Sequence, residues 1–174
     1  MRFDTHFAYG DILYMTARAF RRDTPITIVE IGIGNKADST KFMLHGLMVR
    51  RTVGSKLYSI DINDVLIEKF RRQNKALLSM VEPHSWEGIV GDSGKIKWDK
   101  PIDVLYIDGD HTYEGVKADF ENLVPHVKEG GLIFMHDTNA QRCGYGVDKF
   151  FKEIDMPKIN MKWDRCGFGI ITKP

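Results

Sequence analysis

Three ionisable side chains fall within four positions directly after an apolar run, in the segment "YIDGDHTYEGV" at residues 106–116. Asp108, Asp110 and His111 are residue types that bind divalent cations or transfer protons. A polar turn in which Asp110 or Thr112 caps the next helix is the structural alternative. Because the preceding run reads as a buried strand, we expect these side chains at its carboxyl end, where open α/β sheets bind ligands.

The elements that must position these residues follow an alternating order. Short β-branched runs alternate with helical patterns, which is typical of parallel βαβ units. The last two strands are close in sequence with no helix between them, so they are expected to form an antiparallel hairpin at the sheet edge. The predicted fold class is α/β, a doubly wound, mostly parallel Rossmann-like sheet with an antiparallel C-terminal hairpin. Strands are expected at 26–32, 56–62, 86–92, 102–110, 130–137, 159–165 and 168–173.

Helices are predicted between these strands. The helix in residues 38–51 is expected to take Asp38 or Ser39 as its N-cap. Pro125 should kink or end the helix that starts near Tyr113. Residues 92–101 leave too little chain for much of a helix. A helix at 63–80 is expected to bury Ile62, Leu66, Phe70 and Leu77.

The composition bounds the class of protein. The chain has 174 residues, of which 43% are hydrophobic and 28% charged, enough for the core of one domain over 1–174. An N-terminal helix within residues 1–24 is expected to pack outside that core. The net charge of +1 gives no field that would attract nucleic acid or an anionic membrane, so neither is expected as a partner.

Cysteine content and hydropathy bear on location. Cys143 and Cys166 lack metal-type spacing and do not amount to a disulfide framework. The first twenty residues mix acids and aromatics into their apolar positions, unlike a signal peptide, and no apolar run is long enough to span a bilayer. A cytoplasmic location is therefore the expectation.

Acidic residues gather at the carboxyl ends of the predicted parallel strands. Gly32 and Gly34 follow the first strand, where missing side chains let backbone approach a ligand, although a tight turn without ligand is the alternative. The third glycine of the dinucleotide fingerprint is absent, since Ala37 occupies its place. Asp61 suits ribose hydroxyls or a helix cap, and Asp92 with Ser93 suits an adenine edge or, more simply, a turn.

The combination of Glu30-x-Gly32-x-Gly34, Asp61, Asp92 and Asp108 resembles the class I S-adenosylmethionine-dependent methyltransferases from about Ile26 to the C-terminus. The stretch "IDVLYIDGDHTYEGVKADFENLVPHVKEGGLIFMHDT" is similar to the small metal-dependent O-methyltransferases of the cephalosporin-hydroxylase-like and macrolide-sugar type, and more distantly to the catechol type.

The resemblance implies a cofactor site for S-adenosylmethionine. Glu30, Gly32 and Gly34 would form the loop around the methionine part, and Asp61 would hold the ribose. Asp92 or Ser93 would lie beside the adenine. Asp108 is assigned both to the cofactor site and to a metal.

The resemblance also implies a divalent cation bound by Asp108, His136 and Asp137. Other members carry acid or amide side chains at the pair after the fifth strand, so His136 departs from the pattern. Oxygen-rich ligands favour Mg²⁺, while His136 leaves Mn²⁺ or another transition ion as an alternative. His136 taken alone is equally a hydrogen-bonded histidine of the site wall.

The implied reaction moves a methyl group to a hydroxyl of a small molecule or sugar. In the catechol type a lysine stands where this chain has His111, and sugar-modifying relatives use the acid at Asp110. We place His111 slightly ahead as general base, because its ordinary pKa of about 6.5 suits the task. Asp110 stays a close second.

Two other functions remain as alternatives. A nicotinamide-dependent oxidoreductase is disfavoured by the incomplete glycine fingerprint and the acid cluster. A non-catalytic cofactor-binding accessory protein is favoured by the short connection at 92–101, which leaves little chain for a substrate lid. The same shortness favours a site completed by another subunit in a homo-oligomer. The acceptor is left open among sugar, antibiotic and phenolic hydroxyls.

Overall fold

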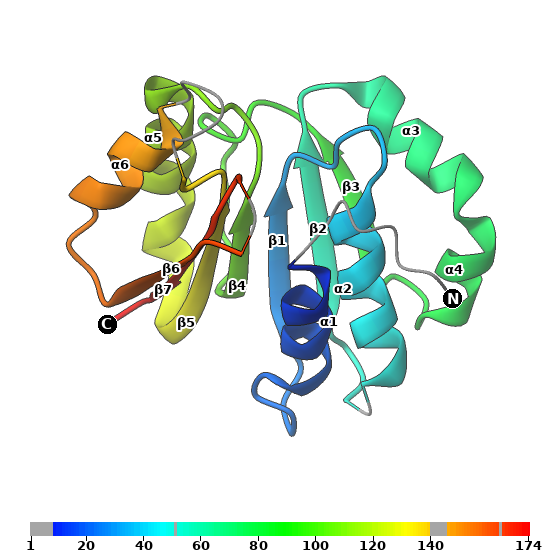
Figure 1. Ribbon diagram of the computed structural model, residues 1–174. Coiled ribbons are helices and arrows are strands. Elements are labelled where there is room, and N and C mark those ends of the chain that lie inside the picture. The colour runs from blue at the N-terminus through cyan, green and yellow to red at the C-terminus, as the bar shows by residue number, and fades with distance from the viewer. Residues whose placement is uncertain (1–8, 51, 140–145, 164) are drawn as a thin grey trace.

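The computed structural model describes residues 9–50, 52–139, 146–163 and 165–174, which build a seven-stranded sheet between two layers of helices (Figure 1). The strand order is β3-β2-β1-β4-β5-β7-β6, parallel from β3 to β5, with β7 antiparallel to β5 and β6. The predicted fold class is confirmed. The strands are β1 Thr27–Ile31, β2 Lys56–Asp61, β3 Trp86–Val90, β4 Ile102–Ile107, β5 Val127–His136, β6 Lys158–Met161 and β7 Phe168–Thr172.

The helices divide between the two faces of the sheet. Helices α1 to α4 lie on one face, and α5 and α6 lie on the other (Figure 1). Their bounds are α1 Gly10–Ala19, α2 Asp38–Val49, α3 Asp64–Gln73, α4 Lys75–Met80, α5 Tyr113–Leu123 and α6 Val147–Glu153, with a 3₁₀ turn at Val124–His126.

Alternation along the central strands supplies both cores. In β1, Ile28 packs with the core under α1, α2 and α3, whereas Val29 packs with the core under α5 and α6. All six residues of β4 are buried. A strand buried on both faces explains why the segment read as a continuous apolar run.

Two predictions about helix starts are wrong. Ala37, with φ 50°, is the N-cap of α2, and neither Asp38 nor Ser39 caps it. Ser39 does not cap the helix because its hydroxyl donates to the Glu30 carboxylate instead. Ile62 is 76% exposed rather than buried, because it lies between the end of β2 and the N-cap Asn63, outside the helix.

The predicted helix at 63–80 is divided into α3 and α4. The break falls at Asn74, whose side chain donates to the Phe70 carbonyl at 3.0 Å and satisfies the end of α3. Phe70 is buried as predicted, and Leu66 and Leu77 are partly buried. The prediction missed Ile67, which is 1% exposed.

Most of the remaining predictions about local structure agree with the fold, although β4 ends at Ile107 rather than at residue 110 and β6 ends at Met161 rather than at residue 165. Helix α5 ends at Leu123, and Pro125 stands in the 3₁₀ turn that follows. Residues 91–101 contain neither helix nor strand. Within the described residues no helix has the length and apolar character needed to cross a membrane. Cys143 lies outside the described residues.

The expected N-terminal helix is α1, which packs along α2. Gly46 allows the close approach, since a Cβ there would stand 2.5 Å from the Tyr14 carbonyl oxygen. Arg50, 8% exposed, follows α2 and donates to carbonyls at and beyond the end of α1. Its acceptors include Ala17, Phe20, Arg21 and Thr24. One guanidinium therefore satisfies the carbonyls that this helix end leaves without internal donors.

Replacing Arg50 with alanine is expected to lower the free energy of unfolding by about 3 kcal/mol, because several buried carbonyls lose a charged donor. Chemical denaturation of Arg50→Ala measures the loss. The matched control is Arg72→Ala, on the exposed side of α3. An Arg50 variant as stable as this control would contradict the role given to the guanidinium.

Candidate functional site

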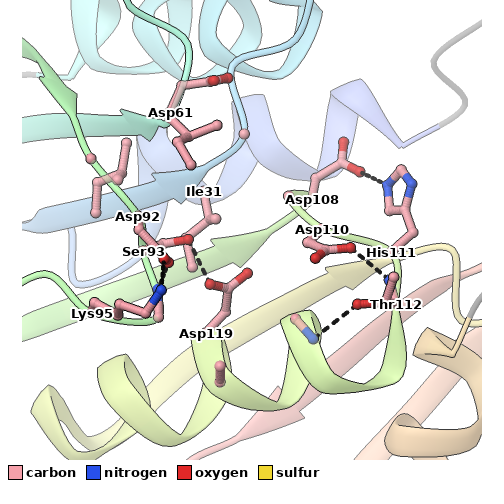
Figure 2. A pocket seen from close by; sticks show the side chains of 18 of the residues that line it. Ile31, Asp61, Asp92, Ser93, Lys95, Asp108, Asp110, His111, Thr112 and Asp119 are labelled. Atoms are coloured by element: carbon pink, nitrogen blue, oxygen red, sulfur yellow. Dashed lines mark hydrogen bonds and ion pairs between the residues drawn. The ribbon is translucent and has the colours of Figure 1, made fainter.

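The strand order reverses between β1 and β4, because the chain continues from β1 outward to β2 and β3 and from β4 outward to β5. Open α/β sheets bind ligands at this point. A cavity of about 800 Å³ lies there, bounded by the segments after β1, β2, β3 and β4 and by the first turns of α5 (Figure 2). Of the residues assigned from the sequence, those lining it are Gly32, Gly34, Asp61, Asp92, Ser93, Asp108, Asp110 and His111.

Gly32 permits the closest approach at this reversal. It has φ 82°, and a Cβ there would stand 2.1 Å from the Asp108 carbonyl oxygen. The Asp108 amide in turn donates to the Ile31 carbonyl at 3.0 Å. Gly34 also has a positive φ of 62°. Glycine is therefore required at position 32 both by conformation and by space.

Glu30 lies behind this loop rather than in the cavity wall. It is fully buried and accepts hydrogen bonds from Ser39, from Thr40 at 2.7 Å and from Ser59 at 2.6 Å. Burial raises the pKa of Glu30 to about 7, although the hydroxyl donors act against the rise. Its carboxylate joins β1, β2 and the start of α2, so the loop between them is held from below.

Asp61 and Asp92 occupy the cavity rim in different ways. Asp61 Oδ2 accepts from the Ile33 amide at 3.0 Å and thereby fixes the loop after β1. Asp92 accepts from the Gly94 amide at 3.0 Å and pairs with Lys95 at 2.6 Å. The turn that was the simpler interpretation of Asp92 is thus present.

Sequence reasoning missed Asp119 on α5. Its carboxylate is 3% exposed, lines the cavity and accepts from Ser93 Oγ at 2.5 Å (Figure 2). Burial raises the pKa of Asp119 to about 6, against the hydrogen bond from Ser93. The available signal was an acid between Val116 and Phe120 on the apolar side of the predicted helix.

Two histidines and two aspartates converge beside the cavity. His111 Nε2 lies 3.4 Å from Asp108 Oδ1 and 3.2 Å from Asp137 Oδ2. His136 Nδ1 lies 3.4 and 3.3 Å from the same two oxygens. Asp137 follows β5 with φ 59°, a conformation that is uncommon for non-glycine residues. The predicted residues Asp108, His136 and Asp137 are therefore brought together, with His111 added to them.

Neighbouring aromatic side chains orient this cluster. The buried Tyr106 hydroxyl donates to Asp108 Oδ2 at 2.9 Å. The Tyr9 ring lies edge-on to His136, with 6.4 Å between ring centroids. Both contacts come from elements that pack on the α1 side of the sheet.

Asp110 faces the start of α5 instead of the cluster. Its Oδ1 accepts from the Thr112 amide at 2.9 Å, and Thr112 Oγ1 accepts from the Gly115 amide at 3.0 Å. A Cβ on Gly115 would stand 2.4 Å from the Asp110 carboxyl carbon. Of the two caps foreseen as the structural alternative, Thr112 is the N-cap of α5, whereas Asp110 accepts from the Thr112 amide ahead of the helix. Of the two candidate bases, it is His111 that lies against Asp108 (Figure 2).

Contacts within the cluster shift the pKa values of Asp108, His111 and His136. Burial raises the pKa of Asp108, but hydrogen bonds from His111 and His136 outweigh burial and lower it overall. Burial lowers the pKa of His136, yet Asp108 and Asp137 outweigh it and raise the value to about 11. The hydrogen bond to Asp108 raises the pKa of His111. Two close carboxylates therefore favour positive charge here, whether as protons or as a cation.

The donor atoms fit a divalent cation. Single donor atoms of Asp108, His111 and Asp137 lie within 4.8 Å of one another, and so do those of His136, Asp137 and Cys166. Carboxylate oxygens and imidazole nitrogens at such separations are common ligands of divalent metals.

Two further residues beside the site contact neighbouring elements. Tyr113 packs against Phe150 and donates to Glu153. Thr138, 2% exposed, donates to Asn160 on β6.

A Rossmann-like sheet with an acid-lined cavity at its switch point is the architecture implied by the resemblance to class I methyltransferases, and the comparisons show the family. Residues 29–138 match the family described as methyltransferase domain, and the chain belongs to that family. The 8-demethyl-8-alpha-L-rhamnosyl tetracenomycin-C 2'-O-methyltransferase of Streptomyces olivaceus is 29% identical over 68% of this chain and 30% of that protein. The resemblance stated from the sequence is confirmed.

Solved structures establish the same fold. An O-methyltransferase from Bacillus cereus in complex with SAH has a TM-score of 0.72 at 17% identity, over 98% of this chain and 83% of that one. An rRNA methylase from Streptococcus thermophilus has a TM-score of 0.67 at 14% identity, over 100% and 99%. The fold alone does not choose the acceptor. The chain spans about a third or less of the length of the curated relatives it matches.

Replacing Glu30 with glutamine tests the buried carboxylate. Because the pKa rises from 4.5 unfolded to about 7 folded, the native chain keeps a proton that the unfolded chain has lost. The free energy of unfolding should therefore fall as pH rises over this interval, by on the order of 3 kcal/mol for this group.

Denaturant unfolding at pH 5 and pH 8 measures that fall. Glu30→Gln should lose most of it, whereas the exposed control Glu129→Gln should keep it. The same pH dependence in the Glu30 variant as in the wild type would rule out a raised pKa.

Proposed function

We propose that the chain is an S-adenosylmethionine-dependent O-methyltransferase acting on a hydroxyl of a sugar or other small molecule. Membership of the methyltransferase-domain family and the sugar O-methyltransferases among its relatives support this proposal. The observation that carries it is the His111, His136, Asp108 and Asp137 cluster beside the switch-point cavity. A nicotinamide-dependent oxidoreductase has no support from the family match.

The chain's cofactor-binding surface would be the cavity at the ends of β1, β2 and β3. Gly32 and Gly34 offer backbone for the methionine part, with Glu30 holding the loop from behind. The Asp61 carboxylate lines the cavity beside this loop and would hold the ribose hydroxyls. Asp92 and Ser93 border the far end, where the adenine would lie. Asp108 adjoins both this cavity and the cluster.

Asp108, His136 and Asp137 would hold a divalent cation. When bound, such an ion makes a coordinated hydroxyl more acidic and fixes its oxygen in place. One imidazole among the ligands, with Cys166 close to His136 and Asp137, suits Mn²⁺ or another transition ion better than Mg²⁺. This donor set moves our preference from Mg²⁺ toward Mn²⁺.

His111 would take the proton from the acceptor hydroxyl as that oxygen receives the methyl group. Its imidazole already contacts the cluster, and it is about one-third exposed, so an acceptor can reach it. Asp110 has one oxygen occupied by the Thr112 amide and faces helix α5. Most of the rate enhancement would come from alignment of the acceptor oxygen with the methyl carbon of the cofactor by the fixed side chains.

Residues 91–101, at the end of the cavity assigned to the adenine, form no helix or strand, and Lys95 and Asp92 are exposed there. Since the curated relatives are much longer, we propose that another part of the protein or a second copy completes the acceptor pocket. The same arrangement is compatible with a non-catalytic accessory protein. Turnover assays distinguish this alternative from a methyltransferase, because an accessory protein would show no methyl transfer.

Asp108→Asn is expected to lower methyl transfer by about 100-fold or more, because one cation ligand is neutralised. Transfer is followed by SAH formation with a panel of nucleotide-linked sugars and simple phenols. Titration with Mn²⁺ and Mg²⁺ gives a readout independent of activity: the wild type should bind Mn²⁺ more tightly, and the variant should lose this binding.

The control for Asp108→Asn is the exposed Asp155→Asn, which should match the wild type in both measurements. Undiminished Mn²⁺ binding in the Asp108 variant would defeat the metal assignment. In the Asp108 variant, the affinity for SAH should change much less than the rate of methyl transfer.

His111→Gln and Asp110→Asn distinguish the two candidate bases. The His111 variant should lose about 100-fold in kcat and retain Mn²⁺ binding, while the Asp110 variant should lose far less. The comparison uses single-turnover rates at fixed SAM concentration. Loss of Mn²⁺ binding in the His111 variant would make this residue a ligand, and a larger kcat loss in the Asp110 variant would make Asp110 the base.

A further inference from the structure

Asp119 is a buried carboxylate that the proposed chemistry does not use. It projects from α5 into the wall of the switch-point cavity and is 3% exposed (Figure 2). Its Oδ1 accepts from Ser93 Oγ at 2.5 Å. Its Oδ2 is buried and has no hydrogen-bond partner among the described residues.

An acceptor oxygen left in this state is costly. A buried polar atom without a partner destabilises a fold by about 1–3 kcal/mol, and more when it carries charge. Helix α5 does not need this carboxylate to hold the 91–96 segment, because Asn122 already donates to the carbonyls of Ser93 and Ile96. The unpartnered Oδ2 atom therefore indicates a ligand that donates a hydrogen bond to it.

Glycines and isoleucines form part of the cavity wall around Asp119. Gly91, Gly94, Gly109 and Gly115 line the cavity; a Cβ would enter open space at Gly91 and would meet protein atoms at the other three. A Cβ on Gly109 would lie 3.3 Å from Asp119 Oδ2 and 2.8 Å from Ile31 Cγ2. Apolar surface is offered by Ile31 and by Ile62, whose side chain is 76% exposed at the end of β2.

We infer that Asp119 recognises the adenine of the cofactor, its Oδ2 accepting a hydrogen bond from the exocyclic amino group at C6. The inference rests on the proposed use of S-adenosylmethionine. It follows from the chemistry of the wall at this place: glycine and isoleucine surface beside an unpartnered acceptor matches an aromatic ring that carries an amino group at its edge.

Asp92 is the rival for this role. Both of its oxygens are already engaged, one by the Gly94 amide and the other by Lys95 at 2.6 Å. Asp92 is also on the exposed rim, where water competes for hydrogen bonds. Ser93, the other residue assigned to the adenine, donates to Asp119 and so orients the carboxylate.

If Asp119 accepts from the amino group, the site should bind adenine more tightly than hypoxanthine. Hypoxanthine carries an oxo group where adenine carries the amino group, and an oxo oxygen facing the Asp119 carboxylate would leave two acceptors opposed. A site built to pair with one donor rejects an analogue that lacks it, because its own polar atom stays unpaired. Measurements at pH 8 lie above the Asp119 pKa of about 6, so the carboxylate is ionised.

Calorimetric titration of the wild-type chain with SAH and with S-inosylhomocysteine tests this without any variant. We expect the inosyl compound to bind at least tenfold more weakly. Equal affinities would overturn the inference while leaving the proposed function intact. If neither compound bound, the proposed cofactor itself would be wrong, and the inference would fall with it.

Asp119→Asn assigns the discrimination to its residue. The amide can still accept from Ser93 and can donate to the oxo group, so the preference for SAH should shrink by tenfold or more. The exposed Asp99→Asn, paired only with Lys100, is the matched control and should keep the wild-type preference. Loss of the preference in Asp92→Asn, with Asp119→Asn unchanged, would give the role to Asp92 and overturn the inference.

Discussion

The site depends on the contact between Gly32 and the backbone of Asp108 at the reversal of the strand order. At this point the loops after β1 and β4 touch, with only 2.1 Å between the Cβ position of residue 32 and the Asp108 carbonyl oxygen. The loop assigned to the cofactor and the first cation ligand are thereby fixed relative to each other. Any side chain at position 32 would separate the two half-sites.

Four buried acids around the central strands differ according to what surrounds them. Glu30 is satisfied by three hydroxyl groups and binds elements together. Asp103 is paired with Arg21 and Lys128 at the opposite end of β4. Asp137 faces imidazoles, and Asp119 keeps one oxygen without a donor. Glu30 and Asp103 are saturated by the chain itself, whereas Asp137 and Asp119, beside the switch-point cavity, have capacity for a ligand.

The sequence sufficed for the mostly parallel sheet, the edge hairpin and the gathering of acids at the strand ends, because these follow from the hydrophobic period and from the rule for open sheets. It did not suffice for side-chain direction within a turn. Asp110 and His111 are neighbours, yet one faces α5 and the other faces the cluster. Ile62 reads as part of an apolar helical face, but the Asn63 cap begins the helix one residue later and leaves Ile62 outside.

The pairing of β1 with β4 also governs when the site can exist during folding. Ile28 pairs with Val104, and the whole of α2, β2, α3, α4 and β3 lies between them in sequence. Closing so long a segment carries a large entropic penalty and makes this one of the slow contacts to form. The cavity thus has no local precursor, and it assembles only as the two halves of the sheet join.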